Sequence, residues 1–108
     1  MIHVRYYRKH HRLTVEGHAH SGEPGKDLVC AGASALAYTL AANAGHLEEQ
    51  GQARDVVVRL DPGSAEISCK PEHRFTALTK CIFDAVCVGF EILSANYPQY
   101  ISYEIRHG

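Results

Sequence analysis

Apolar residues recur at every second position in five short segments of the chain. Such alternation is typical of a strand with one buried face. The residues expected on these faces are Ile2, Val4 and Tyr6; Leu13, Val15 and Gly17; Val56, Val58 and Leu60; Ala65, Ile67 and Cys69; and Ile101, Tyr103 and Ile105. The polar residues 8–12 predict a hairpin connection between the first two strands. An Asp-Pro-Gly turn at 61–63 predicts a second hairpin.

Two longer segments carry apolar residues at spacings of three and four, which predicts helices. The first is expected to begin after Asp27, since Asp is among the best N-cap residues, and to end between Gly45 and Glu49. The second is expected to end near Asn96, because Pro98 cannot continue a helix. The predicted apolar stripes are Val29, Ala33, Leu36, Leu40, Ala44 and Leu47 in the first helix and Phe75, Leu78, Ile82, Val86, Gly89 and Leu93 in the second.

The order of these elements, ββαββαβ, predicts one domain over residues 1–108 with an α+β fold of two layers. Strands that alternate polar and apolar residues leave one face of a sheet in water, so we expect both helices on the other face of a five-stranded mixed sheet. The second helix also carries a second apolar stripe, formed by Phe83, Cys87 and Phe90. An apolar arc that wide is commonly buried on two sides. We expect either a second copy of the chain, in a homodimer, or the first helix of the same chain to cover this stripe.

The composition excludes several classes of protein. With 108 residues, 45% of them apolar, the chain is long enough to form one core without metal or disulfide staples. A net charge of −1 gives no overall field that attracts nucleic acid or an anionic membrane. The basic N-terminal residues leave no apolar segment for a signal peptide, and residues 28–45 are too weakly apolar for a membrane span. We therefore expect a cytoplasmic protein that does not bind a membrane.

The four cysteines form no recognisable pattern. Neither a Cys-X-X-Cys pair nor the Cys and His spacing of a zinc site is present. The histidines likewise have no carboxylate or cysteine at ligand spacing, so we predict no metal and no cofactor. In a reducing compartment the cysteines are free thiols. Three of them, Cys69, Cys81 and Cys87, are expected to be core residues.

The fourth cysteine differs because of its position. Cys30 lies in the first turn of the predicted helix, where unpaired N–H groups and the helix dipole stabilise a thiolate. His18 lies at the exit of the second strand, and the segment 19–26 between them, with Gly22 and Gly25, predicts a loop. A loop that returns across the sheet edge brings imidazole and thiol within hydrogen-bonding reach. In the resulting hypothesis Cys30 attacks a carbonyl carbon, N–H groups at the helix start hold the oxyanion, and His18 protonates the leaving amine.

Three neighbouring features have two interpretations each. Asp27 either caps the helix or also orients the histidine. Ser34, one turn beyond the cysteine, either makes room for a substrate backbone or belongs to close helix packing by small residues. Gly22 and Gly25 either let the loop open and close over a bound chain or form an ordinary glycine-rich turn.

Residue identities around this site resemble those of a known family. The motif consists of Gly17-His18-Ala19, Gly22, Gly25, Asp27 and Val29-Cys30-Ala31-Gly32-Ala33-Ser34-Ala35. It resembles the Prp family of ribosomal-processing cysteine proteases, and the element order extends the likeness over nearly the whole chain. The resemblance implies a cytoplasmic, homodimeric endopeptidase that removes a short N-terminal extension from ribosomal large-subunit protein twenty-seven, cutting beside aromatic residues. The family's catalytic Cys and His fall on Cys30 and His18, its Asp on Asp27 and its Ser on Ser34.

A ribosome-associated RNA-binding module is the competing hypothesis. The first predicted hairpin combines positive charge with aromatic rings, which suits an RNA backbone and stacked bases. The residues are Arg5, Tyr6, Tyr7, Arg8, Lys9 and Arg12. Such a protein would lose affinity as salt rises and would tolerate substitution of Cys30, whereas the protease hypothesis predicts the reverse. A solvated hairpin is the more frequent outcome for such a segment, so we expect no direct binding of nucleic acid.

Overall fold

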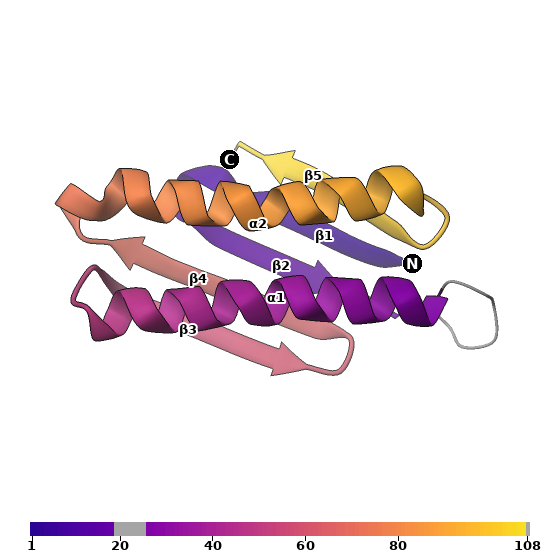
Figure 1. Ribbon diagram of the computed structural model, residues 1–108, viewed down its shortest axis with the longest axis horizontal. Coiled ribbons are helices and arrows are strands. Elements are labelled where there is room, and N and C mark those ends of the chain that lie inside the picture. Colours follow the sequence, from indigo (N-terminus) through magenta and orange to yellow (C-terminus); the bar gives the residue numbers. More distant parts are fainter. Residues whose placement is uncertain (19–25, 108) are drawn as a thin grey trace.

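The computed structural model, which describes residues 1–18 and 26–107, contains five strands and two long helices (Figure 1). In chain order these are β1 (Ile2–Tyr7), β2 (Arg12–Glu16), α1 (Lys26–Glu49), β3 (Ala53–Asp61), β4 (Ser64–Pro71), α2 (Thr76–Asn96) and β5 (Ile101–Arg106). Two short 3-10 helices, η1 (Arg8–His10) and η2 (His73–Phe75), precede β2 and α2. The predicted ββαββαβ order is confirmed.

The strands form one mixed sheet in the order β3-β4-β2-β1-β5. Neighbouring strands are antiparallel except β1 and β5, which run parallel. Both helices cover the same face of the sheet: α1 lies along β3 and β4, and α2 lies along the side formed by β1 and β5 (Figure 1). The predicted two-layer α+β architecture is therefore confirmed.

The two helices fill the core between the layers unequally. From α2, Phe83 and Phe90 are fully buried, and Tyr6 of β1 stacks on Phe83 with ring centroids 6.2 Å apart. Thr79 of α2 is buried as well, and its hydroxyl donates to the carbonyl oxygen of Phe75 at 2.9 Å. The buried residues of α1 are mostly smaller: Val29, Ala33, Ala37, Leu40, Ala44 and Leu47.

The prediction that a second copy of the chain or α1 covers the second apolar stripe of α2 is wrong. Phe83, Cys87 and Phe90 are buried on the sheet itself rather than under α1 or a second copy. The other predicted stripe of α2, which includes Gly89, is the one that contacts α1. A Cβ atom added at Gly89 would clash with Leu36 of α1. Periodicity identifies an apolar arc but not the direction in which it faces. Here the large aromatic rings fill the space above the sheet, and the glycine lets the helices approach closely.

α1 differs from its prediction at its start. The helix begins at Lys26, so Asp27 lies within the first turn and the N-cap prediction is wrong. Cys30 is the fifth residue of the helix and begins its second turn, so its predicted place in the first turn is wrong as well. An acidic residue is favourable both at the N-cap and in the first turn, so its presence does not fix the starting residue. Contrary to the sequence argument, residues 27–49 also pass as a membrane span by length and composition, with a mean hydropathy of 1.3. In this fold one face of the helix packs on the sheet, and 33% of the apolar span is buried.

β3 is an edge strand and is largely exposed. Val58 and Leu60, predicted on a buried face, are 43% and 37% exposed because, within the described chain, nothing pairs with the outer side of β3. A bulge between Arg54 and Val57, with Asp55 at a φ of 51°, interrupts the pairing with β4. The uninterrupted pairing next to the turn therefore covers residues 57–61, and Ala53 and Arg54 pair with β4 on the other side of the bulge.

Candidate active site

Gly17 follows β2 at one end of the sheet. The register pairs Glu16 with Ser64, so the exit of β2 lies beside the turn between β3 and β4. Gly17 donates its N–H to the carbonyl oxygen of Gly63 at 2.9 Å and has a φ of 106°. A Cβ atom at this position would clash with the carbonyl oxygen of Met1. The backbone therefore requires glycine directly before the candidate base.

His18 lies against the same turn. Its main-chain oxygen accepts a hydrogen bond from the amino group of Met1 at 3.0 Å. Its ring lies so close to Gly63 that a Cβ atom added there would clash with Nε2. The turn was predicted only as a hairpin connection. Its contact with the imidazole was missed because His18 and Gly63 are far apart in the sequence, and only the register of β2 with β4 brings them together.

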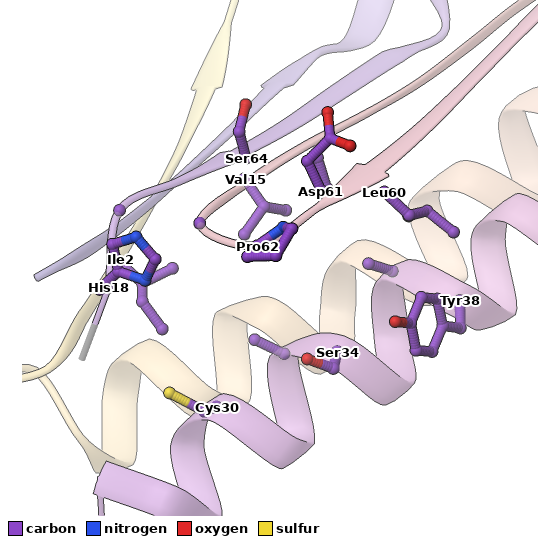
Figure 2. Close-up of a pocket in the computed structure, with 15 residues that line it drawn as sticks. Ile2, Val15, His18, Cys30, Ser34, Tyr38, Leu60, Asp61, Pro62 and Ser64 are labelled. Carbon is purple, nitrogen blue, oxygen red and sulfur yellow. The ribbon is translucent and has the colours of Figure 1, made fainter. Parts of the chain in front are cut away.

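Cys30 and Ser34 lie on the side of α1 that faces this turn. Together with His18 they line a cleft of about 400 Å³ between α1 and the β3–β4 turn (Figure 2). Figure 2 shows the Sγ atom of Cys30 directed toward the side on which His18 lies. The structure thus brings the predicted nucleophile, the predicted base and Ser34 to one cleft. The other lining residues are Ile2, Val15, Gly17, Ala33, Ala37, Tyr38, Leu60, Asp61, Pro62, Gly63, Ser64 and Ala65.

The two candidate catalytic side chains, those of Cys30 and His18, are not hydrogen-bonded to each other in this structure. Cys30 is half-buried and His18 is exposed, and within residues 1–18 and 26–107 no hydrogen bond joins their side chains. Catalytic hydrogen bonds are often long without substrate and shorten in the complex. The arrangement is therefore compatible with a thiol–imidazole pair that a bound substrate completes.

One predicted site residue is described but does not line the cleft, and two others lie outside the described residues. Asp27 is exposed in the first turn of α1 and is not among the described residues that line the cleft. Its orientation of His18 stays a prediction. The predictions for Gly22 and Gly25, and for movement of their loop, lie outside the described residues.

Two apolar side chains at the cleft were not predicted as site residues. Tyr38, which is 58% exposed, follows Ser34 by one helical turn, so the spacing of Cys30, Ser34 and Tyr38 was a usable signal. Leu60 was predicted as a core residue of a strand. It lines the cleft because β3 lies at the sheet edge, which the alternating pattern does not reveal.

The other three cysteines lie outside the cleft. Burial raises the pKa of Cys69 to about 11 and that of Cys87 to about 12, so both are neutral thiols at physiological pH. Cys81 is exposed, and its prediction as a core residue is wrong because that side of α2 faces away from the sheet. Among the described residues, no group of His, Cys, Asp and Glu side chains is arranged to hold a metal ion.

The arginines of the first hairpin are paired with carboxylates. The ion pairs are Arg5–Glu104 (3.1 Å), Arg8–Asp84 (2.9 Å) and Arg12–Glu66 (2.6 Å). Each pair neutralises charge that an RNA phosphate would need. Tyr6 is 1% exposed, and its hydroxyl donates to Asp84 at 2.7 Å, so its ring is not accessible for stacking on a base. The structure therefore does not favour the RNA-binding alternative.

A thiol and an imidazole that line one cleft at the start of a helix are the groups of a cysteine-dependent hydrolase. Comparison with known families matches residues 1–102 to the family described as cysteine protease Prp. The chain belongs to this family of cysteine proteases, as the sequence resemblance predicted. None of the curated proteins compared with the sequence matches it.

Solved structures with the same fold come from streptococcal and staphylococcal proteins. SMU.848 of Streptococcus mutans has a TM-score of 0.70 and 24% identity, and the match covers 99% of this chain and 93% of that chain. The essential ribosomal processing protease Prp of S. aureus, in complex with a substrate peptide, has a TM-score of 0.69 and 19% identity, with 97% of each chain covered. The same protease with a covalently linked product peptide has a TM-score of 0.67 and 20% identity, again with 97% of each chain covered. At these identities the likeness establishes the shared fold.

Proposed function

We propose that this chain is a cysteine endopeptidase that removes the N-terminal extension of ribosomal large-subunit protein twenty-seven during ribosome maturation. The observation that carries the proposal is the placement of Cys30 and His18 on one cleft in a chain of the Prp family. The structural relative from S. aureus is a ribosomal processing protease with a bound substrate peptide, which supports a ribosomal protein as the substrate class.

Cys30 is the nucleophile in this proposal. Its thiol transfers a proton to His18, and the sulfur forms a C–S bond with the carbonyl carbon of the scissile peptide. Backbone N–H groups in the first turn of α1, which have no acceptor within the helix, stabilise the oxygen that becomes negative. His18 then gives its proton to the leaving nitrogen, and the C–N bond breaks.

Water completes the cycle. His18 accepts a proton from a water molecule, whose oxygen attacks the thioester carbon. The C–S bond then breaks, the new carboxyl group leaves with its peptide, and Cys30 returns as a thiolate beside the protonated His18. Ser34, which lines the cleft one turn beyond Cys30, is proposed to contact the substrate backbone. Asp27 is proposed to orient His18, and Gly22 and Gly25 to let their loop close over the substrate.

We also propose that the protein acts in the cytoplasm as a homodimer. The apolar surface that supports a dimer differs from the stripe predicted from the sequence. Val88 and Ile92 of α2 are 53% and 56% exposed, and Ile105 of β5, 42% exposed, lines the same shallow hollow as Val88. Neighbouring exposed apolar side chains mark protein–protein contacts. Ile92→Lys is expected to convert dimers into monomers in light scattering.

The function is tested by incubating the purified protein with the extended form of the ribosomal protein. We expect cleavage by the wild type and a loss of roughly 10³-fold or more in kcat/KM for Cys30→Ala and for His18→Ala. Cys81→Ala is the matched control, because Cys81 is exposed on α2 outside the cleft, and it should cleave as the wild type does. Unaltered cleavage by Cys30→Ala would refute the mechanism.

A further inference from the structure

The outer edge of β3 leads directly into the cleft. β3 is an edge strand of the sheet, and within the described residues no strand pairs with its outer side. Leu60 of this strand lines the same cleft as Cys30 and His18. Figure 2 shows Leu60 above Tyr38 of α1, at the end of the cleft opposite to His18. The open strand edge and the candidate active site therefore form one continuous surface.

The backbone groups of Val58 and Leu60 point to this open side. Toward β2, Cys69 of β4 donates its N–H to His11 at 3.1 Å, and Gly63 accepts from Gly17 at 2.9 Å. Backbone directions alternate along a strand, so the odd-numbered residues of β4 bond β2 and its even-numbered residues bond β3. The partners of those even-numbered residues in β3 are Val57, Arg59 and Asp61. The N–H and C=O groups of Val58 and Leu60 are consequently directed away from β4.

The side chains beside this edge are apolar. Val58 lies opposite the buried Ile67 of β4, and Leu60 lines the cleft, so both are on the face of the sheet that α1 covers. They remain 43% and 37% exposed, and Tyr38 of α1, which lines the cleft together with Leu60, is 58% exposed. A strand placed here would meet polar backbone groups at its side and apolar side chains on one of its faces.

We propose that the substrate binds as an added strand on β3, with its backbone paired to Val58 and Leu60 and alternate side chains placed against Leu60 and Tyr38. The inference rests on the proposed protease function and specifies how that site holds its substrate. Addition of an extended peptide to a sheet edge is an established mode of peptide recognition, in which backbone bonds give affinity and alternate side chains give specificity. It directs the bound chain along the cleft toward Cys30.

A peptide fits this edge better than a second copy of the chain does. The bulge between Arg54 and Val57 limits the regular edge to residues 57–61, which is short for a stable contact between two folded domains. A second copy paired with β3 would also cover Leu60 and obstruct the cleft. A short extended segment of a substrate needs no more than this length.

The experiment combines a strand variant with modified peptides. Val58→Pro removes the outward N–H without removing a bond to β4, and proline is tolerated on edge strands in that orientation. Val58→Ala is its matched control, because it removes the side chain and keeps the N–H. We expect Val58→Pro to lower kcat/KM about tenfold below Val58→Ala, mainly through KM, because one backbone hydrogen bond is lost. The rate of Cys30 alkylation by iodoacetamide should be equal in both variants.

A second measurement does not depend on any variant of β3. The probe is a synthetic peptide that spans the cleavage site of the ribosomal protein, methylated at one backbone nitrogen at a time. Wild-type cleavage and binding to Cys30→Ala should both weaken at every second position, because alternate N–H groups of an added strand face β3. Equal effects at all positions, together with equal kcat/KM for the two Val58 variants, would overturn strand addition.

The remaining outcomes separate this inference from the proposed function. Period-two binding to Cys30→Ala without cleavage by the wild type refutes the catalytic assignment and supports strand addition. Cleavage with neither a period-two pattern nor a difference in kcat/KM between the two Val58 variants supports the catalytic assignment and refutes strand addition. Absence of both binding and cleavage refutes both. A halved mass of Val58→Pro in light scattering would identify the edge as a contact between copies and would overturn the inference as well.

Discussion

α1 and α2 lie side by side on one face of the sheet (Figure 1). Their side chains fill the space between helix and sheet differently. Under α2, the rings of Phe83 and Phe90 are completely buried against the sheet. Under α1, Ala33 and Ala37 are buried but reach only a short distance, and a cleft of about 400 Å³ remains between this helix and the β3–β4 turn. The size of the side chains on the inner face of each helix thus decides where the protein has a closed core and where it has a cavity.

The polar groups of the two sides differ in the same way. On the α2 side Asp84 accepts hydrogen bonds from Tyr6 at 2.7 Å and from Arg8 at 2.9 Å, and the pKa of Asp84 is lowered mainly by the Arg8 hydrogen bond. On the α1 side the side chains of His18 and Cys30 make no hydrogen bond within the described part of the chain. Groups that are already satisfied stabilise the fold, whereas groups without partners are available to a substrate. The comparison therefore locates chemistry on the side where packing is incomplete.

The largest expected effect comes from creating a cavity in the closed core under α2. Phe83→Ala removes a fully buried ring that stacks on Tyr6, and it should lower the free energy of unfolding by about 3–5 kcal/mol. Ser34→Ala, on the cleft side, is the comparison variant and should change that free energy by less than about 0.5 kcal/mol. Urea unfolding followed by circular dichroism measures both. Similar losses for the two variants would contradict the contrast between the two sides.

A smaller effect is expected from adding a side chain to the β3–β4 turn beside the cleft. Gly63→Ala places a methyl group against the imidazole of His18, and we expect kcat/KM to fall about 10–100-fold as the ring is displaced. Gly51→Ala is a matched control, because Gly51 also has a positive φ, 68°, but has no atom within 4 Å of an added Cβ. Both variants should lose about 1 kcal/mol of stability from backbone strain. Equal activity of the two would show that Gly63 does not position His18.

The smallest expected effect is a difference in alkylation rate between the thiols of α1 and α2. Cys30, at the start of α1, should react with iodoacetamide several-fold faster than the exposed Cys81 at neutral pH. Cys69 and Cys87 are buried, and burial raises their pKa values, so they should react only after unfolding. Peptide mass spectrometry after timed labelling measures each rate. Equal labelling of Cys30 and Cys81 would count against an activated nucleophile.

Local patterns were reliable where the physical cause is itself local. The alternation from Ile2 and the three- and four-residue spacing after Asp27 predicted strands and helices, because each reflects which side of one element is buried. The proximity of His18 and Cys30 was also predictable, since one loop connects a strand exit to a helix start. The structure places both on one cleft. The start of α1 was predicted less well, because Asp is favourable at more than one position of a helix terminus.

Errors arose where the cause lies between distant residues. Phe83 was placed on the wrong side of α2 and Cys81 in the core, because an apolar arc does not state which neighbour it meets. The positive charge of the first hairpin indicates an anionic partner only in the sequence, because in the fold Arg5 of β1 is paired with Glu104 of β5. Leu60 was expected to be buried, and it is an edge residue at the cleft because β3 ends the sheet.

The sequence by itself determined the elements, their order, and the two residues that carry the proposed chemistry, because burial periodicity and turn residues act over a few positions. Only the tertiary structure decided that Gly63 supports His18, that β3 leaves an open edge and that the small residues of α1 leave a cleft above the sheet. These properties depend on strand register and on which helix face meets the sheet. Contacts between distant segments set both, and no short stretch of sequence contains that information.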